Sequence, residues 1–304
     1  MRRASRWRRW HPRPEGCAAY TRGVSPLKEA TIAIVGTGAM AEAMIAGLLS
    51  GGHVAAAQVI ASDPRAERRE VVEAKYGIRT SGSNSEAIDG ADVVVLAIKP
   101  QMLLKVGREL SSVLRPDQVV ISILAGSTTK ALGNAMHHDA IVRAMPNTPA
   151  QLGKGMTVWC ATEQVTELQR AQAAALLSSL GAEIHVEDEK YVSMSTAVSG
   201  TGPAYVFLVM EALIDAAVHL GFPRHIAHDL VIETLLGSTL LAQASGDHPA
   251  YLRNMVTSPA GTSAAAIAEM EKGRLRTVLS EAVFAAYRRT EELGRELEEE
   301  TSAE

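Results

Sequence analysis

The spacing of apolar and polar positions changes once along the chain. From Thr31 to about Glu187, short apolar runs such as TIAIVG and GADVVVLAIKP alternate with longer mixed segments such as AERREVVEAKYG. The apolar runs predict strands buried on both faces, and the mixed segments predict helices between them. This alternation is typical of an α/β fold with a doubly wound parallel sheet covered by helices.

Beyond Glu187 the pattern is helical only, and three of the predicted helices begin at Pro203, Pro223 and Pro249. Proline suits a first helical turn, where its missing N–H leaves no hydrogen bond unmade. The change of pattern places a domain boundary near Glu187 to Val192. We expect a disordered basic tail over 1–28, an α/β domain over 29–188 and an all-helical domain over 189–299.

Composition narrows the class of protein. The 304 residues carry a formal net charge of −4, which gives no global attraction to nucleic acid or an anionic membrane. The two cysteines, Cys17 and Cys160, are too few for a disulfide framework or a cysteine-ligated metal cluster, and they fit a reducing cytoplasm. The apolar stretch Ala204–Leu220 is interrupted by Glu211 and Asp215, so we expect no membrane span, and no metal-binding motif is present.

The first thirty residues are set apart by arginines interleaved with Trp7 and Trp10 and followed by prolines. One interpretation is a basic arm that binds nucleic acid or anionic lipid. The other is a disordered tail, or an extension upstream of the functional start, because no apolar segment follows the arginines as a secretory signal requires. We favour the tail, and we expect no nucleic-acid partner.

A glycine-rich turn, VGTGAMA, follows the first predicted strand and opens the first predicted helix. Gly36 permits the tight turn, Gly38 lets a pyrophosphate approach the backbone, and Ala41 allows the helix to pack closely on the strand. The helix N-terminus then offers free N–H groups and the positive end of its dipole to phosphates. The turn therefore predicts a dinucleotide-binding loop.

The end of the second predicted strand indicates which dinucleotide is bound. An acidic side chain there bonds the ribose hydroxyls of NAD, whereas a small hydroxyl residue followed by arginine accommodates the phosphate of NADP. The chain carries both signals, with Ser62 and Arg65 on either side of Asp63. Asp63 could equally cap the next helix, and Arg65, Arg68 and Arg69 could form a solvated helix face. We expect NADPH, with NADH also possible.

Three motifs recur later in the chain: MPNTP at Met145–Pro149, SGTGPAY at Ser199–Tyr205 and TSPAGTSAAAIAEME at Thr257–Glu271. Together they resemble the pyrroline-5-carboxylate reductase family, the enzymes of the last step of proline biosynthesis. The resemblance implies NAD(P)H-dependent reduction of the C=N bond of 1-pyrroline-5-carboxylate to L-proline. It also implies an N-terminal Rossmann-like domain and a C-terminal helical domain that forms a homodimer by interlocking helices, with dimers often assembled further.

For the cofactor, the resemblance implies contacts from the glycine loop and from the ends of the other strands, where ligands of parallel sheets bind. Asn84 could instead cap a helix, and Lys99 could be a solvated strand end. The expected cofactor-binding residues are Val35, Gly36, Thr37, Gly38, Ala39, Met40, Ser62, Asp63, Arg65, Asn84, Ala97, Ile98, Lys99, Pro100, Ile123, Leu124, Ala125 and Asn147.

For the substrate, the resemblance implies the SGTG segment and the loop TSPAGTS. The loop departs from the family's TSPGGTT, because Ala260 replaces the first glycine and Ser263 the second threonine, and Met255 stands where relatives often have Asn or Gln. We expect a helix N-cap at Thr262 and Ser263 whose N–H groups hold a carboxylate, and Ser263 to hydrogen-bond the imine nitrogen as the catalytic residue. A capping hydroxyl is the alternative. The expected substrate-binding residues are Ser199, Gly200, Gly261, Thr262 and Ser263.

The segment PAYVFLVMEALIDAAVHLG is apolar around most of a helix, so it needs partners on more than one side. A homodimer provides them, and a monomeric bundle is the alternative. Two other functions stay open. A hydroxyacid-dehydrogenase-like oxidoreductase typically carries a lysine on this helix, but none lies between Pro203 and Leu220. A catalytically impaired dinucleotide-binding sensor or scaffold would be compatible with the departures at Ala260, Ser263 and Met255.

Overall fold

A computed structural model of the chain describes residues 25–302. By compactness these residues form two units. The sheet unit runs through Pro203 and takes in the chain from Val283 onward, and the helical unit is Ala204–Ala282. Most of the arginine-rich tail that the sequence sets apart lies outside the described residues.

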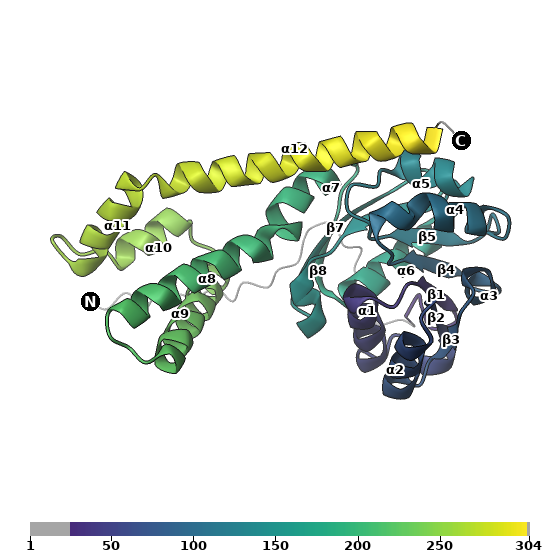
Figure 1. The fold of residues 1–304 in the computed structure, drawn as a ribbon, viewed down its shortest axis with the longest axis horizontal. Helices are drawn as coiled ribbons and strands as arrows, with labels where there is room; N and C mark the ends of the chain where they lie inside the picture. The colour runs from purple at the N-terminus through teal and green to yellow at the C-terminus, as the bar shows by residue number, and fades with distance from the viewer. Residues whose placement is uncertain (1–24, 303–304) are drawn as a thin grey trace, which may run out of the picture. The chain divides into compact units, whose positions relative to one another are not determined.

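Within the described residues, eight strands form one sheet in the order β3-β2-β1-β4-β5-β6-β7-β8 (Figure 1). Neighbouring strands are parallel except at the β6–β7 pair. The predicted α/β doubly wound fold is confirmed. The strands are β1 Ile32–Val35, β2 Val59–Ser62, β3 Arg79–Ser81, β4 Val93–Leu96, β5 Val119–Ser122, β6 Ile141–Met145, β7 Gly155–Ala161 and β8 Gly181–His185.

The antiparallel β6–β7 pair departs from the all-parallel sheet expected from the sequence. The connection between these strands contains only a short 3-10 helix, η3 (Thr148–Leu152). A parallel connection needs a crossover of a dozen or more residues, usually with a helix, whereas a short connection turns the chain back on itself. The length of the MPNTP connection therefore sets the direction of β7.

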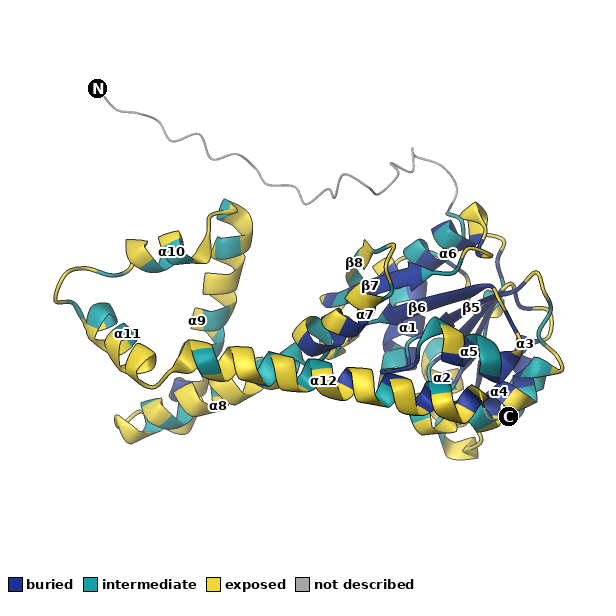
Figure 2. Cartoon of the chain, turned by 90° about the horizontal axis from the view of Figure 1, so that it is seen from above, coloured by how far each residue is buried: buried dark blue, intermediate teal, exposed yellow. Residues whose placement is uncertain are grey.

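Helices cover both faces of the sheet and create two cores. Along β1, Ile32 and Ile34 belong to one core and Ala33 and Val35 to the other, because alternate residues of a strand point to opposite faces. The central strands, among them β5 and β6 in Figure 2, are buried, whereas the edge strands β3 and β8 are not. The helices of the sheet unit that precede the helical unit in the chain are α1 Ala39–Ser50, α2 Ala66–Tyr76, α3 Asn84–Ile88, α4 Leu103–Ser111, α5 Thr129–Met136, α6 Glu167–Ser178 and α7 Lys190–Ser195. Two short 3-10 helices, η1 Ala56–Gln58 and η2 Pro100–Met102, lie among them.

The last helix, α12 (Leu275–Ser302), ends in the sheet unit. Leu297 is buried in the core formed with α4 and α5, and Thr128 donates a hydrogen bond to Glu298 at 2.7 Å. Leu293 lies against Gly126, whose φ of +76° favours glycine. The C-terminal end of the chain therefore supports the turn that follows β5.

The helical unit lacks a core of its own. It consists of α9 (Arg224–Ser245), α10 (Pro249–Met255), α11 (Thr262–Lys272), most of α8 (Gly202–His219) and the start of α12. Ala227 is the one buried residue among Ala204–Ala282, while Phe207 is 59% and Leu220 82% exposed. Apolar surface of this extent marks an interaction site.

The helical stretch Lys190–His219 also has the length and composition of a membrane-crossing helix, the one such stretch among residues 25–302. From the sequence we expect no span here, because Glu211 and Asp215 interrupt the apolar pattern. Even with these two acidic residues, the stretch stays apolar enough to cross a membrane. Length and composition alone therefore leave two environments for this helix, a membrane or a protein partner.

The boundary of the N-terminal tail needs a correction. From the sequence we expect the tail to cover 1–28, but Leu27 is fully buried in the core beneath α1 and α6. The Gln58 side-chain amide donates to the carbonyls of Lys28 and Ala30 at 2.8 and 2.9 Å. Folded structure is therefore present from Ser25, because Leu27 is apolar enough to enter the core although arginines and prolines precede it.

We expect Leu27→Ala to lower the free energy of unfolding by about 2–5 kcal/mol, because it removes a fully buried leucine side chain and leaves a cavity. Lys28→Ala, at the exposed neighbouring position, should change it by less than about 0.5 kcal/mol. Urea unfolding of both variants measures the difference. Equal effects would show that Leu27 is not part of the core.

Candidate active site

The glycine loop lies where β1, β2 and β4 end. Gly36 has φ +95°, and its N–H donates to the Ser62 carbonyl at 2.8 Å. A Cβ atom added to Gly36 would lie 2.7 Å from the carbonyl oxygen of Ala97. The chain can therefore turn here only with glycine, as the sequence analysis expects for Gly36.

Helix α1 begins directly after this turn, with Gly38 as its N-cap. The first helical hydrogen bond runs from the Glu42 N–H to the Gly38 carbonyl, so the N–H groups of the first turn have no partner within the helix. A Cβ atom added to Gly38 would meet nothing within 4 Å. Open space beside free N–H groups at a helix N-terminus fits a phosphate group.

Asp63, at the end of β2, holds the glycine loop in place. Its Oδ2 atom accepts hydrogen bonds from the Thr37 N–H at 3.3 Å and the Thr37 hydroxyl at 2.8 Å. The Arg65 guanidinium donates to both carboxylate oxygens, at 2.9 and 3.0 Å. Burial acts to raise the pKa of Asp63, but the hydrogen bonds from Arg65 and Thr37 outweigh it and hold that pKa well below its usual range.

Asp63 does not cap α2 from the N-cap position, which Arg65 occupies. The alternative of a solvated arginine face is also wrong for two of the three arginines. Arg68 donates to the Thr37 carbonyl at 2.7 Å and pairs with Glu42, and Arg69 donates to the Asp63 carbonyl at 2.8 Å. The Arg65 side chain remains 65% exposed at the edge of the loop.

Ser62 and Asn84 form a second contact at this edge. Ser62 is buried and donates to the Asn84 side-chain oxygen at 2.7 Å, and the Asn84 amide donates to Glu109 at 2.8 Å. The alternative that Asn84 caps α3 is wrong, because Ser83 is the N-cap and accepts the Glu86 N–H. Glu109 on α4 has no motif that would have identified it from the sequence.

The remaining expected cofactor residues follow β4, β5 and β6. The Ala97 N–H donates to the Val35 carbonyl at 2.9 Å, and the Ile123 N–H donates to the Leu96 carbonyl at 3.2 Å. Lys99 is the N-cap of η2 and Asn147 the N-cap of η3. The structure therefore brings the expected cofactor residues together along the carboxyl edge of the parallel strands. These residues are the glycine loop, Ser62 to Arg65, Asn84, Ala97 to Pro100, Ile123 to Ala125 and Asn147.

Asn147 contacts the SGTG segment, the expected substrate segment that lies in the sheet unit. Its amide nitrogen donates to the Ser199 carbonyl at 3.0 Å, and its amide oxygen accepts the Met156 N–H at 2.8 Å. Gly200 lies against the Met145 side chain, at 2.7 Å from an added Cβ atom to the Met145 Cε. The motifs MPNTP and SGTGPAY, which are distant in sequence, are thus in direct contact in the folded chain.

The loop Thr257–Ser263 belongs to the helical unit and precedes α11. Gly261 is the N-cap and makes no side-chain cap bond, so Thr262 and Ser263 are the first helical residues rather than caps. A Cβ atom on Gly261 would overlap the Ser258 hydroxyl. Ala260 has φ +58°, a left-handed conformation that favours glycine. The first-turn N–H groups have no helical partner and are available to an anion.

Other candidate chemistry is limited. Among residues 25–302, no group of three His, Cys, Asp or Glu side chains is arranged to hold a metal ion. Burial raises the pKa of the Cys160 thiol to about 12, so the thiolate needed of a nucleophile is not formed near neutral pH.

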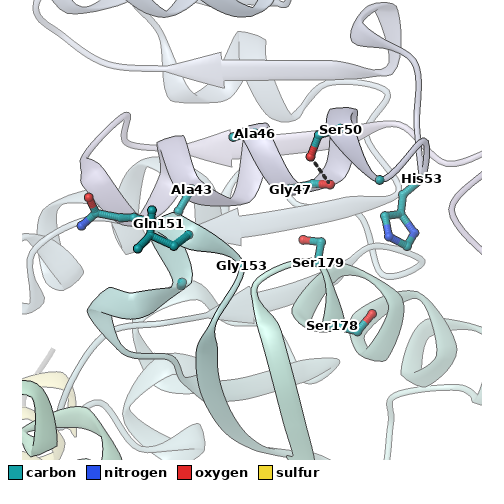
Figure 3. A pocket seen from close by; sticks show the side chains of 12 residues that line it. Ala43, Ala46, Gly47, Ser50, His53, Gln151, Gly153, Ser178 and Ser179 are labelled. Carbon is teal, nitrogen blue, oxygen red and sulfur yellow. Dashed lines mark hydrogen bonds between the residues drawn. The ribbon is translucent and has the colours of Figure 1, made fainter. Parts of the chain in front are cut away.

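A pocket of about 510 Å³ lies beside the C-terminal half of α1, away from the glycine loop at its N-terminus (Figure 3). It is lined by Gly47, Ser50, His53, Gln151, Ser178 and Ser179, among others. The Ser50 hydroxyl donates to the Gly47 carbonyl at 3.5 Å. The pocket shares no residue with the expected cofactor or substrate sets.

Known proteins resemble both parts of the chain. The family model described as pyrroline-5-carboxylate reductase dimerisation matches residues 189–293, and one described as NADP oxidoreductase, coenzyme F420-dependent, matches residues 31–126. Pyrroline-5-carboxylate reductase of Synechocystis is 42% identical over 87% of this chain and 98% of its own length. The Escherichia coli protein of that name is 35% identical over 88% of this chain and 99% of its own length.

Solved structures agree with these matches. A pyrroline-5-carboxylate reductase from Coxiella burnetii, 35% identical, superimposes with a TM-score of 0.81 over 87% of this chain and 98% of its own. A pyrroline carboxylate reductase from Plasmodium falciparum with NADP bound, 27% identical, gives a TM-score of 0.80 over 88% of this chain and 99% of its own.

The two glycines of the loop should respond differently to substitution. Gly36→Ala should lower the free energy of unfolding by more than about 2 kcal/mol, because its Cβ overlaps the Ala97 carbonyl and its φ is positive. Gly38→Leu should leave the melting temperature close to that of the parent, since its Cβ enters open space, but should weaken dinucleotide binding. Thermal melting and dinucleotide titration test both, and a Gly38→Leu variant that binds like the parent would refute the phosphate assignment.

Ala260→Gly should stabilise the protein by about 0.5–1 kcal/mol, because it removes the cost of a left-handed alanine, which exceeds the added chain entropy of glycine. Ala266→Gly, the same change inside α11 at an exposed position, should destabilise it by about 1 kcal/mol. Chemical unfolding gives both values. Destabilisation by Ala260→Gly would show that the loop is not strained at this residue.

Proposed function

The chain belongs to the pyrroline-5-carboxylate reductase family, and from this premise we propose how its residues perform the family's reaction. It is an oxidoreductase that uses NADPH to reduce the C=N bond of 1-pyrroline-5-carboxylate to L-proline. The observation that carries this function is the matched identity over nearly the whole chain, together with a glycine loop that has room for a phosphate.

The cofactor binds along the carboxyl edge of the strands. The first-turn N–H groups of α1 and the space beside Gly38 hold the pyrophosphate. Arg65, whose exposed side chain lies three residues after β2, is the cation for the additional phosphate of NADPH. A related structure contains NADP, which supports this choice, and use of NADH stays a prediction. When bound, the nicotinamide supplies the hydride.

The substrate is held by the loop before α11. First-turn N–H groups at Thr262 and Ser263 bind the carboxylate, since the helix N-terminus carries a partial positive charge. The Ser263 hydroxyl hydrogen-bonds the imine nitrogen, and water supplies the proton that this nitrogen gains as the carbon accepts the hydride. Ser199 and Gly200, held by the MPNTP segment, complete the set of proposed substrate residues.

The exposed apolar surface of α8 (Gly202–His219), which has no buried residue, is covered by a second copy of the chain. It lies in the segment that the dimerisation family model matches, and that match supports a homodimer rather than a membrane as its environment. Assembly of dimers into larger oligomers, a cytoplasmic location and the absence of a nucleic-acid partner stay predictions. The rival hydroxyacid-dehydrogenase and scaffold functions have no comparable support in the matches at 35–42% identity.

Steady-state assays of the parent with NADPH, NADH and 1-pyrroline-5-carboxylate test the function directly. The absorbance of NADPH should fall, with proline as the product. No loss of absorbance with either dinucleotide would favour the scaffold.

We expect Ser263→Ala to lower the single-turnover rate about ten- to a hundred-fold, because the hydrogen bond to nitrogen changes on the way to the transition state whereas the carboxylate contact does not. The melting temperature should barely change, since Gly261 and not Ser263 is the N-cap. Ser263→Thr should retain the rate. An unchanged chemical step in Ser263→Ala would remove this hydroxyl from the mechanism.

A further inference from the structure

The helix that leaves the sheet unit is interrupted by a π-turn at the SGTG motif. Between α7 and α8, residues Thr196–Gly200 form a π-helix, in which the Thr201 N–H donates to the Thr196 carbonyl five residues earlier at 2.8 Å. The Thr201 hydroxyl donates to the same carbonyl at 2.8 Å. Single π-turns inside α-helices are frequent at functional sites.

The carbonyl of Ser199 cannot find its usual partner in this helix. In an α-helix it would accept the N–H of the residue four positions later, which here is Pro203. Proline has no N–H, so the usual donor to the Ser199 carbonyl, four residues later, is absent. A buried or half-buried carbonyl left without a donor is costly, and native structures find one elsewhere.

Asn147 supplies the missing donor from outside the helix. Its amide nitrogen lies 3.0 Å from the Ser199 oxygen. Its amide oxygen accepts the Met156 N–H at 2.8 Å, which fixes the side chain against the start of β7. Both ends of the Asn147 amide are thus held by the protein, and the group joins the β6–β7 connection to the π-turn.

A second contact keeps the same two segments together. Gly200 lies so close to Met145 that an added Cβ atom would be 2.7 Å from its Cε atom. Met145 and Asn147 lie on either side of Pro146, and they contact the adjacent residues Gly200 and Ser199 respectively. The contact region is small, and a side chain at 200 would displace the Met145 methyl group from it.

We propose that Asn147 is a positioning residue that sets the Ser199–Gly200 backbone for substrate by donating the hydrogen bond that Pro203 cannot. Asn147 acts on the imine substrate through the π-turn and not through contact with the dinucleotide. The inference rests on the proposed function, because it needs Ser199 and Gly200 to face the substrate.

The main test uses Asn147→Asp, which keeps an oxygen to accept the Met156 N–H, removes the donor to Ser199 and sets a carboxylate oxygen against the Ser199 carbonyl. We expect kcat/KM for 1-pyrroline-5-carboxylate to fall about ten- to a hundred-fold, the range for a lost hydrogen bond in a reacting complex, while the Kd for NADPH, measured by fluorescence titration, stays within about two-fold. Asn134→Asp is the matched control, because Asn134 donates to Ser302 elsewhere in the same unit, and it should leave both constants unchanged.

A rescue variant separates positioning from general stability. Pro203→Ala returns an N–H four residues after Ser199, so Asn147→Asp/Pro203→Ala should recover most of the lost kcat/KM. A purely structural role for Asn147 predicts a lower melting temperature with unchanged kcat/KM below it, and this result would overturn the proposal. Failure of Pro203→Ala to restore activity, or an NADPH Kd that rises in parallel with the loss, would overturn it as well.

Binding measurements keep this test separate from that of the function. Calorimetric titration of L-proline into the NADP⁺-loaded protein reports on the substrate site without turnover. We expect Asn147→Asp to weaken L-proline binding about ten-fold and Pro203→Ala to restore it. Unchanged L-proline binding contradicts the inference, whereas a parent that binds L-proline but does not turn over contradicts only the proposed function.

Discussion

The close approach of Gly36 to the Ala97 carbonyl is the constraint on which the cofactor edge depends. It brings the turn after β1 against the turn after β4, the two strands between which the sheet order reverses. The direction of α1 follows from the same contact, since the helix begins only three residues later. A side chain at this position would separate the strand ends, and with them the N–H groups and the open space that suit a phosphate.

Charges around the loop are matched so that the turn keeps its form over a wide range of pH. Glu42 accepts hydrogen bonds from Arg68, Lys75 and Tyr76, chiefly Arg68, and its pKa falls to about 2. A lowered carboxyl pKa contributes stability that is fully present above the usual value of 4.5 and is lost only as the pH falls toward about 2. The pKa of Asp63 is lowered as well, so its contribution to stability is likewise lost only at low pH. Arg65 keeps part of its positive charge toward solvent, where an anionic ligand can use it.

Local patterns in the sequence predicted the alternation of strands and helices along the chain, the glycine turn and the change to helices near Glu187. They could not predict features that depend on partners distant in the chain. Asn147 was expected at the cofactor because of its motif, and its contact with Ser199 becomes visible only when the two segments are folded together. The one available signal was Pro203, four residues after Ser199, which removes a donor from the helix. The prediction of a cap at Thr262 and Ser263 followed the general preference for hydroxyl residues at N-caps. The N-cap is Gly261, because the turn leaves no room for a side chain beside the Ser258 hydroxyl.

The near absence of buried residues in the helical unit has a consequence for how the protein behaves at low concentration. A unit whose one buried residue is Ala227 gains little from folding by itself, so the free energy that keeps it folded comes from association. Each ten-fold dilution then removes about 1.4 kcal/mol from the folded assembly, as for any obligate dimer. The midpoint of thermal unfolding is therefore a property of protein concentration as well as of sequence, and dilute enzyme loses its structure at temperatures that a concentrated stock withstands.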